Sequence, residues 1–100
     1  MAPINAIEFR ARLNNGGQIN ILDVREEIEY STYNIGGKNM PLSKLPGSIT
    51  QLGYNKTDEI IVICKIGLRS ETARKLLDQN GYINVRNLSG GLIALQKLDQ

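Results

Sequence analysis

Residues 60–63 place the tightest limit on what this chain can fold into. They read Ile-Ile-Val-Ile, an unbroken β-branched run without the polar alternation of a strand that has one face in water. Such a run is typical of a strand buried on both faces, as in a parallel sheet covered by helices. Cys64 follows directly, so we expect it at the carboxyl end of a central strand. In open α/β sheets this is the edge at which ligands bind.

The composition limits the class of protein. One hundred residues, 41% of them hydrophobic, are enough for one domain with a core and too few for two, so we predict one domain over residues 1–100. No apolar run is long enough to cross a bilayer, and the amino-terminal residues lack the pattern of a secretory signal. We therefore expect a cytoplasmic protein without a membrane partner. The net charge of +2 is too small to indicate a nucleic-acid partner.

Cysteine and histidine usage limits the chemistry. The chain has one cysteine and no histidine. An internal disulfide, a multi-cysteine metal site, histidine-assisted nucleophilic catalysis and the common histidine-ligated metal sites are therefore excluded. We expect no metal and no cofactor. Cys64 is either an inert buried thiol or a reactive one, and its activation would have to come from backbone dipoles or a nearby Lys or Arg.

The rest of the sequence alternates helical and strand patterns. We expect a helix over residues 5–13, a strand over 19–24, a short surface helix over 25–30 anchored by Ile28, a broken or late-starting helix over 42–53, the strand 60–63, a helix over 70–80, a strand over 83–88 and a final short helix around 92–95. This alternation, with short connections, predicts an α/β domain with a parallel sheet and helices on both faces.

The loop that follows the buried strand is the predicted reactive site. A loop that leaves a strand and enters a helix can curl so that its backbone amides point inward, at the positive end of the helix. Gly67 permits such a curl, and Lys65 and Arg69 add positive charge. The inward-pointing amides, the helix dipole and the positive charges all favour the thiolate and lower the pKa of Cys64. We expect Cys64 to be the nucleophile and its substrate to contact Lys65, Ile66, Gly67, Leu68, Arg69 and Ser70.

Three motifs resemble those of rhodanese-type sulfurtransferases. The sequence Cys64-Lys-Ile-Gly-Leu-Arg-Ser70 is similar to the family's active-site loop, commonly Cys-Arg-x-Gly-x-Arg-Ser. The sequence Leu22-Asp-Val-Arg-Glu26, with Glu29-Tyr30, resembles its first signature, and Asn87-Leu-Ser-Gly-Gly91 its closing turn. The motifs stand in the family's order and spacing over nearly the whole chain.

The resemblance implies a single rhodanese-like domain with a five-stranded parallel sheet flanked by helices on both faces. It also implies a sulfurtransferase whose cysteine takes a sulfane sulfur as a persulfide. The donor would be a small sulfur-containing anion such as thiosulfate. The acceptor would be a nucleophile, cyanide in vitro or a sulfur-carrier protein in the cell.

Two segments depart from the common family pattern. The chain has Tyr33-Asn-Ile-Gly-Gly37 where many members have Gly-His-Ile-Pro-Gly-Ala, and Leu92 where many have Trp. The first variant, followed by Met40-Pro-Leu42, is similar to rhodanese domains fused behind ubiquitin-activating-like adenylyltransferases of molybdopterin and thiamine biosynthesis. The resemblance therefore implies a domain of a longer protein, with a sulfur-carrier protein or a cysteine desulfurase as partner.

Other interpretations stay open at this point. Cys64 could be a small buried hydrophobe, and Lys65 and Arg69 could be solvated surface charges. Asp23 and Arg25 could belong to the pocket, but the sequence favours an ion pair that holds the strand end. A non-catalytic interaction module could keep this fold, although the retained cysteine counts against it. A cysteine-dependent phosphatase or arsenate reductase also uses a thiolate among amides. The phosphatases need Cys-x5-Arg, and here a serine occupies the arginine's place.

Overall fold

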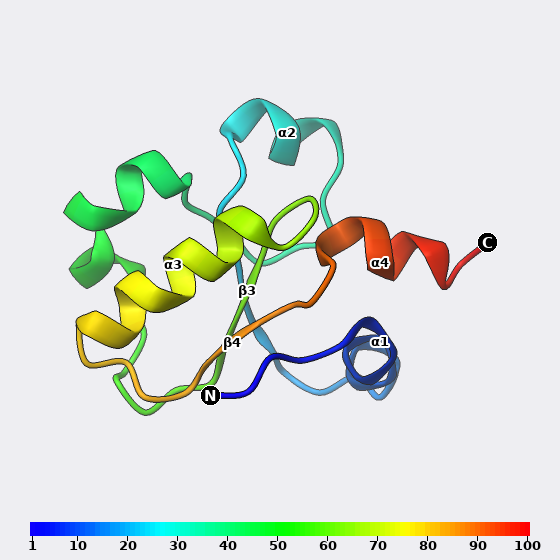
Figure 1. The fold of residues 1–100 in the computed structure, drawn as a ribbon, viewed down its shortest axis with the longest axis horizontal. Coiled ribbons are helices and arrows are strands. Elements are labelled where there is room, and N and C mark those ends of the chain that lie inside the picture. The colour runs from blue at the N-terminus through cyan, green and yellow to red at the C-terminus, as the bar shows by residue number, and fades with distance from the viewer.

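Four parallel strands form the centre of the computed structural model, which describes residues 1–100, and lie in the order β2-β1-β3-β4 (Figure 1). They are β1 (Asn20–Asp23), β2 (Lys38–Asn39), β3 (Ile60–Ile63) and β4 (Val85–Asn87). All four residues of β3 are buried, and β3 pairs with β1 on one side and β4 on the other. The unbroken apolar run therefore forms a central strand, as the sequence predicts.

The five-stranded sheet implied by the family resemblance is wrong by one strand. Beyond β4, Ile4 makes an isolated parallel bridge with Leu88, in which its amide donates to the Asn87 carbonyl at 3.0 Å. The pairing does not extend, because the next residues that would face β4 are Ala2 and Ala6: the Ala2 carbonyl accepts a hydrogen bond from the Arg86 side chain, and Ala6 is the first residue of α1 (Ala6–Asn14). The sheet edge is therefore covered by one residue instead of a fifth strand.

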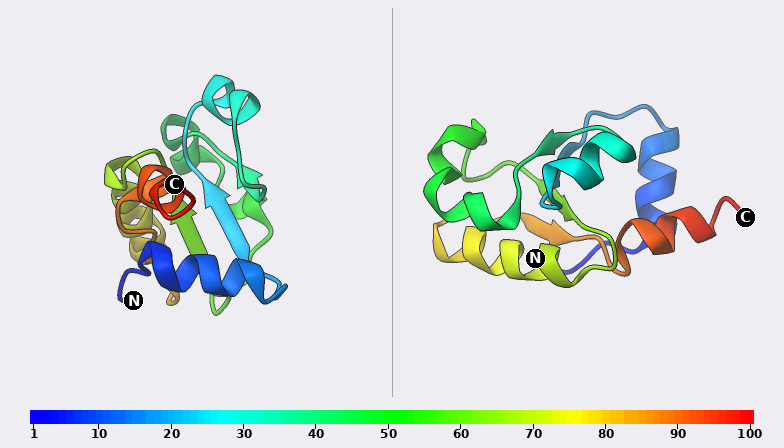
Figure 2. Two further views of the ribbon diagram at one scale, coloured as in Figure 1. Left: turned by 90° about the vertical axis from the view of Figure 1, so that its right-hand side faces the viewer. Right: turned by 90° about the horizontal axis from the view of Figure 1, so that it is seen from above.

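Helices cover both faces of the sheet (Figures 1 and 2). On one face α1 (Ala6–Asn14) packs against α4 (Gly91–Lys97), over a core that includes Phe9, Ile61 and Ile63. On the other face lie α3 (Leu68–Gln79) and the 3-10 helices η1 (Leu42–Gly47) and η2 (Ile49–Leu52), over a core that includes Ile60, Val62 and Cys64. Because side chains alternate along β3, Cys64 belongs to the face covered by α3.

The boundaries of several elements differ from those expected. The helix expected from residue 70 begins two residues earlier, because Gly67 adopts a left-handed conformation, φ 98°, that turns the chain directly into α3. The segment 42–53 is interrupted between η1 and η2, as the expected broken helix. The strands expected over 19–24 and 83–88 are shorter at both ends. No helix combines the length and the apolar character that crossing a membrane requires.

The short helix α2 (Glu27–Thr32) is held differently from what the sequence predicts. The prediction that Ile28 anchors it is wrong, because Ile28 is 74% exposed and no residue of α2 is buried. Polar contacts hold the helix instead: the Tyr30 hydroxyl donates to the Gly37 carbonyl at 2.8 Å, and Lys44 pairs with Glu27. The apolar side chain of Ile28 is left free beside the pocket described below.

Candidate active site

Cys64 follows β3 directly, and its side chain turns into the loop rather than out to solvent. The residue is 1% exposed. Its Sγ accepts hydrogen bonds from the amides of Gly67, at 3.1 Å, and Ser70, at 3.3 Å, and lies 3.2 Å from the Ser70 Oγ. The amides come from the loop and from the first turn of α3, where amide hydrogens have no partner within the helix. We call this arrangement around Sγ the cradle.

The turn at residues 89–91, which leads into α4, fixes the carbonyl groups of the cradle loop. The Leu92 amide donates to the Cys64 carbonyl at 2.9 Å, and the Ile93 amide donates to the Lys65 carbonyl at 3.0 Å. Gly91, at φ 63°, lies so close that a Cβ there would be 2.5 Å from the Lys65 carbonyl oxygen. The loop carbonyls therefore face α4 and leave the following amides free to face the sulfur.

Hydrogen bonding outweighs burial in setting the charge of Cys64. Burial, the largest single influence, raises the pKa of the thiol. The Ser70 hydroxyl and the amides of Ser70, Gly67 and Ile66 together lower the pKa below its ordinary value, because hydrogen bonds to the sulfur stabilise a thiolate. The sequence predicts the amides, whereas the serine hydroxyl becomes evident only in the structure.

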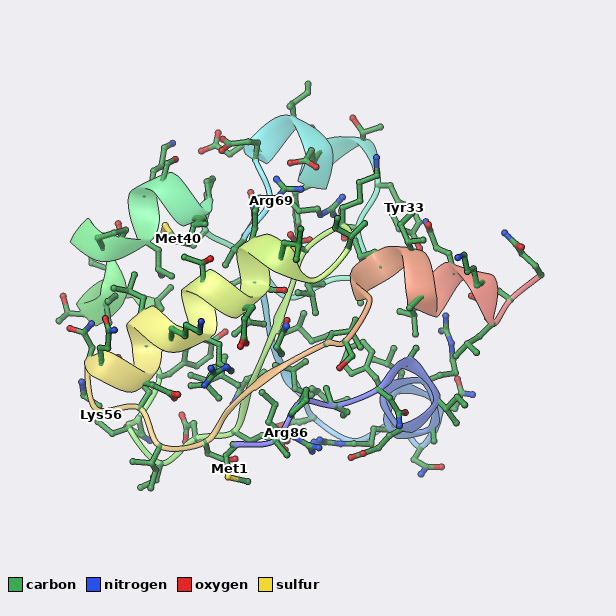
Figure 3. All side chains as sticks on the ribbon, in the orientation of Figure 1. Met1, Tyr33, Met40, Lys56, Arg69 and Arg86 are labelled. Atoms are coloured by element: carbon green, nitrogen blue, oxygen red, sulfur yellow. The ribbon has the colours of Figure 1, made fainter.

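Arg69 is not a free cation at the cradle. Its guanidinium forms a bidentate ion pair with Glu29 of α2, with Nη1–Oε1 and Nη2–Oε2 distances of 2.6 and 3.0 Å. This hydrogen bonding lowers the pKa of Glu29 to about 2. Figure 3 shows Arg69 lying close to α2. The first turn of α3 is thereby fastened to a helix that has no buried side chain of its own.

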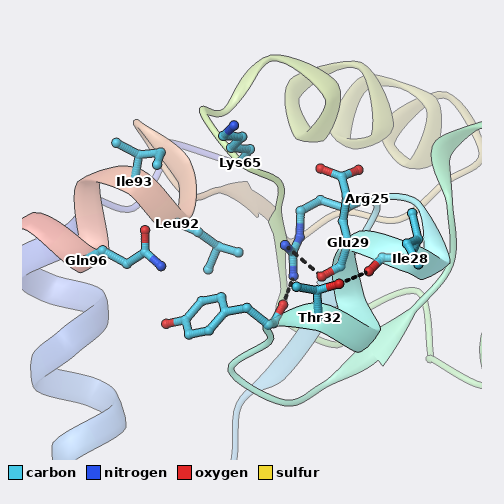
Figure 4. A pocket seen from close by; sticks show the side chains of 9 residues that line it. Arg25, Ile28, Glu29, Thr32, Lys65, Leu92, Ile93 and Gln96 are labelled. Atoms are coloured by element: carbon cyan, nitrogen blue, oxygen red, sulfur yellow. Dashed lines mark hydrogen bonds between the residues drawn. The ribbon is translucent and has the colours of Figure 1, made fainter.

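Asp23 and Arg25 form a buried ion pair. Their residues are 0% and 6% exposed, and the shortest contact, Nη2–Oδ2, is 2.8 Å. Arg25 also donates to the carbonyls of Tyr33, at 2.7 Å, and Glu29, at 3.4 Å (Figure 4). Both roles that the sequence leaves open are observed: the ion pair joins the end of β1 to α2, and Arg25 also lines the pocket described next.

A pocket of about 430 Å³ lies between α2 and α4, beside the cradle (Figure 4). It has apolar and polar walls, lined by Arg25, Ile28, Glu29, Thr32, Tyr33, Lys65, Leu92, Ile93 and Gln96. Of the site residues expected from the sequence, only Lys65 lines it. Lys65 is exposed and forms no ion pair, whereas Arg25 is neutralised by Asp23, so Lys65 supplies the pocket's free positive charge. The structure contains no group of three or more metal-ligating side chains.

The structure brings some of the expected site residues to the sulfur and turns others away. The amides of Gly67 and Ser70 donate to Sγ, and the Ile66 amide contributes to lowering the thiol pKa. The side chains of Ile66 and Leu68 are 53% and 70% exposed. Asn87 was not expected in the site, yet it accepts a 2.5 Å hydrogen bond from the Ser70 hydroxyl. Its place in the closing motif is the one sequence signal that could have drawn attention to it.

The fold and the loop around Cys64 agree with a comparison of the chain with known protein families. A family model for the rhodanese-like domain matches residues 5–98. The chain belongs to the rhodanese-like family. A solved structure with the same fold, a rhodanese-like domain protein from Staphylococcus aureus, is 28% identical with a TM-score of 0.83, over 95% of this chain and 91% of that one.

Relatives of this rhodanese-like chain include sulfurtransferases. It is 34% identical over 80 residues to the thiosulfate sulfurtransferase PspE of Escherichia coli (strain K12), covering 77% of this chain and 76% of PspE. It is 35% identical over 85 residues to a protein of Bacillus subtilis (strain 168) named "Putative sulfur carrier protein YrkF", covering 84% of this chain and 45% of YrkF. It is 31% identical over 101 residues to the adenylyltransferase and sulfurtransferase MOCS3-2 of Zea mays, covering 93% of this chain and 20% of MOCS3-2. The chain thus spans less than half the length of YrkF and MOCS3-2.

Proposed function

We propose that Cys64 carries a sulfane sulfur as a persulfide, which it takes from a small sulfur-containing anion such as thiosulfate. The observation that supports this most is the set of donors around Sγ, two amides and a hydroxyl within 3.3 Å. The thiolate attacks the outer sulfur of thiosulfate, a new Sγ–S bond forms, and sulfite leaves with the electron pair of the broken S–S bond. A nucleophilic acceptor then attacks the terminal sulfur and returns the thiolate; with cyanide the product is thiocyanate.

The residues of the loop divide this work between backbone and side chains. The amides of Ile66, Gly67 and Ser70 stabilise the anionic sulfur, and Leu68 contributes its backbone at the start of α3. The free charge of Lys65 attracts the donor to the pocket, and Arg69 adds positive charge that Glu29 partly neutralises. In this proposal Cys64 is the one residue that forms a covalent bond.

The cellular acceptor is proposed from the relatives. MOCS3-2 joins adenylyltransferase and sulfurtransferase activities in one protein, and this chain matches 20% of it. By analogy we propose that this domain works beside an adenylyltransferase and passes sulfur to a sulfur-carrier protein in molybdopterin biosynthesis, with a cysteine desulfurase as a further partner. The cytoplasmic location expected from the sequence stays a prediction.

The intact mass of the protein after incubation with thiosulfate tests the proposal. We expect the protein to gain the mass of one sulfur atom, and cyanide to remove it with release of thiocyanate. The matched control is Cys64→Ser, which replaces the sulfur by oxygen in the same cradle and should gain nothing. A wild-type protein that stays unmodified, or a serine variant with near wild-type sulfur transfer, would refute the proposal.

Phosphatase chemistry is disfavoured by the same loop. The sixth residue after Cys64 is Ser70, which is fully buried and whose amide donates to Sγ, so no arginine stands where a phosphatase would clamp the transferring group. The neighbouring Arg69 already uses two nitrogens on Glu29. A non-catalytic interaction module would have no use for the amide cradle around Cys64. We therefore favour the sulfurtransferase function over that of an interaction module.

A further inference from the structure

Behind the cradle, Asn87 is hydrogen-bonded to both Ser70 and Gly67. Ser70 is 0% exposed and Asn87 is 9% exposed. The Ser70 hydroxyl donates to the Asn87 Oδ1 at 2.5 Å, and the Asn87 Nδ2 donates to the Gly67 carbonyl at 3.1 Å. The same Ser70 Oγ lies 3.2 Å from the Cys64 Sγ. One serine hydroxyl therefore has two neighbours that can take its hydrogen.

A count of hydrogens shows that these two neighbours compete. A serine hydroxyl has one hydrogen to donate. While Cys64 is a thiol, its hydrogen goes to the Ser70 oxygen and the Ser70 hydrogen goes to Asn87, so every group has a partner. Once Cys64 is a thiolate it can only accept, and the Ser70 hydrogen must go either to the sulfur or to Asn87. If it turns to the sulfur, a buried amide oxygen loses its donor, which is unfavourable.

We propose that Asn87 is a positioning residue that sets the charge state of Cys64 by competing with the sulfur for the Ser70 hydrogen. The hydroxyl points to Asn87 beside the thiol and turns to the sulfur in the thiolate and the persulfide. Asn87 does not line the pocket that contains Lys65. It lines a separate pocket of about 390 Å³, together with Met1, Pro3, Gly67, Leu68, Glu71, Arg74 and Ser89. Its side-chain hydrogen bonds go to Ser70 and Gly67 and none goes to Sγ, so it acts on the sulfur through Ser70.

A double-mutant cycle on the thiol tests this inference. The pKa of Cys64 is measured from thiolate absorbance and alkylation rate against pH, in wild type, Asn87→Ala, Ser70→Ala and the double variant. Asn87→Ala should lower the thiol pKa by about half to one unit, the equivalent of one net hydrogen bond, because the Ser70 hydrogen is released to the sulfur. In the Ser70→Ala background this downward shift should be absent, because no hydroxyl hydrogen is left to release. Loss of the Asn87–Gly67 contact is common to both backgrounds and cancels.

A second variant keeps the inference testable if the alanine variant does not fold. Asn87→Asp has nearly the same shape and presents a negatively charged acceptor, so it should raise the thiol pKa instead of lowering it. Opposite shifts for Ala and Asp are not expected from a general loosening of the loop. An equal Asn87→Ala shift with and without the Ser70 hydroxyl, or an unchanged or lowered pKa in Asn87→Asp, would overturn the inference. The titration uses no sulfur donor, so its result is separate from that of the sulfur-transfer test.

Discussion

Replacing Glu29 by Gln separates two roles that Arg69 could have. If the Arg69–Glu29 pair only fastens α2 to α3, then Glu29→Gln and Arg69→Ala both weaken the fold, and adding Arg69→Ala to the Glu29→Gln variant leaves the KM for thiosulfate unchanged. If Arg69 also attracts the substrate, adding Arg69→Ala to the Glu29→Gln variant raises the KM. The Glu29→Gln background is needed because Glu29 lines the pocket and its own charge repels an anion. We expect the second pattern, because Arg69 directly precedes Ser70 in the loop around Cys64. The pKa of Arg69 is raised mainly by its hydrogen bond to Glu29, and the negative charge of the Cys64 thiolate adds to the rise.

The size of the stability effect follows from the geometry. A fall in the pKa of Glu29 from its usual value near 4.3 to about 2 would correspond, if fully expressed, to about 3 kcal/mol. The side chains of Arg69 and Glu29 are 36% and 30% exposed, so water screens the pair and we expect a coupling of about 1 kcal/mol. A partly screened charge of this kind should change the KM by about two- to fivefold.

The assay combines urea unfolding with steady-state transfer from thiosulfate to cyanide. The two single variants and the double variant give the coupling free energy, and the KM is measured at low and high salt because screening weakens the effect of an exposed charge. The matched control is Glu71→Gln, which breaks another bidentate glutamate–arginine pair on α3, with Arg74, away from the Lys65 pocket. It should leave the KM unchanged.

The pH dependence gives the stability measurement a second check. The pKa of Glu29 is depressed in the folded state, so the stabilisation is fully present above about pH 4.3 and is lost as the pH falls towards 2. A KM that is the same in Glu29→Gln and in the double variant would refute the substrate-attracting role of Arg69. A coupling near zero at pH 7 would refute the account of how α2 is held.

Three further predictions follow from the cradle. Titration of the Cys64 thiol should give a pKa below about 8.5, since the donors to Sγ outweigh burial, and a value at or above it would contradict the cradle. Gly91→Ala should lower the free energy of unfolding by about 2 to 4 kcal/mol, because the added Cβ would lie 2.5 Å from the Lys65 carbonyl oxygen and the backbone φ of 63° is unfavourable for alanine. The control is Gly17→Ala, which should change the free energy of unfolding little, because no atom lies within 4 Å of the added Cβ. The unmodified protein should not hydrolyse an aryl phosphate, and robust turnover would overturn the argument from Ser70.

The sequence alone determined the features that depend on neighbours along the chain. The buried strand could be predicted because an unbroken β-branched run has no face that suits water. The sharp turn at Gly67 could be predicted because that residue tolerates a positive φ, and the amides around Cys64 follow from a helix that starts there. The alternation of strands and helices, with the three motifs, was enough to indicate the rhodanese-like fold.

The tertiary structure decided which distant residues meet. Glu29 and Arg69 are 40 positions apart, and Ser70 and Asn87 are 17 apart, so no local pattern pairs them. Their contacts arise only when the carboxyl ends of neighbouring strands come to one edge of the sheet. The missing fifth strand and the exposed Ile28 have the same origin, because burial and pairing depend on which surfaces remain uncovered after packing. Local steric preferences can be inferred from the sequence, whereas the hydrogen-bond and ion-pair partners of distant residues depend on how the whole chain packs.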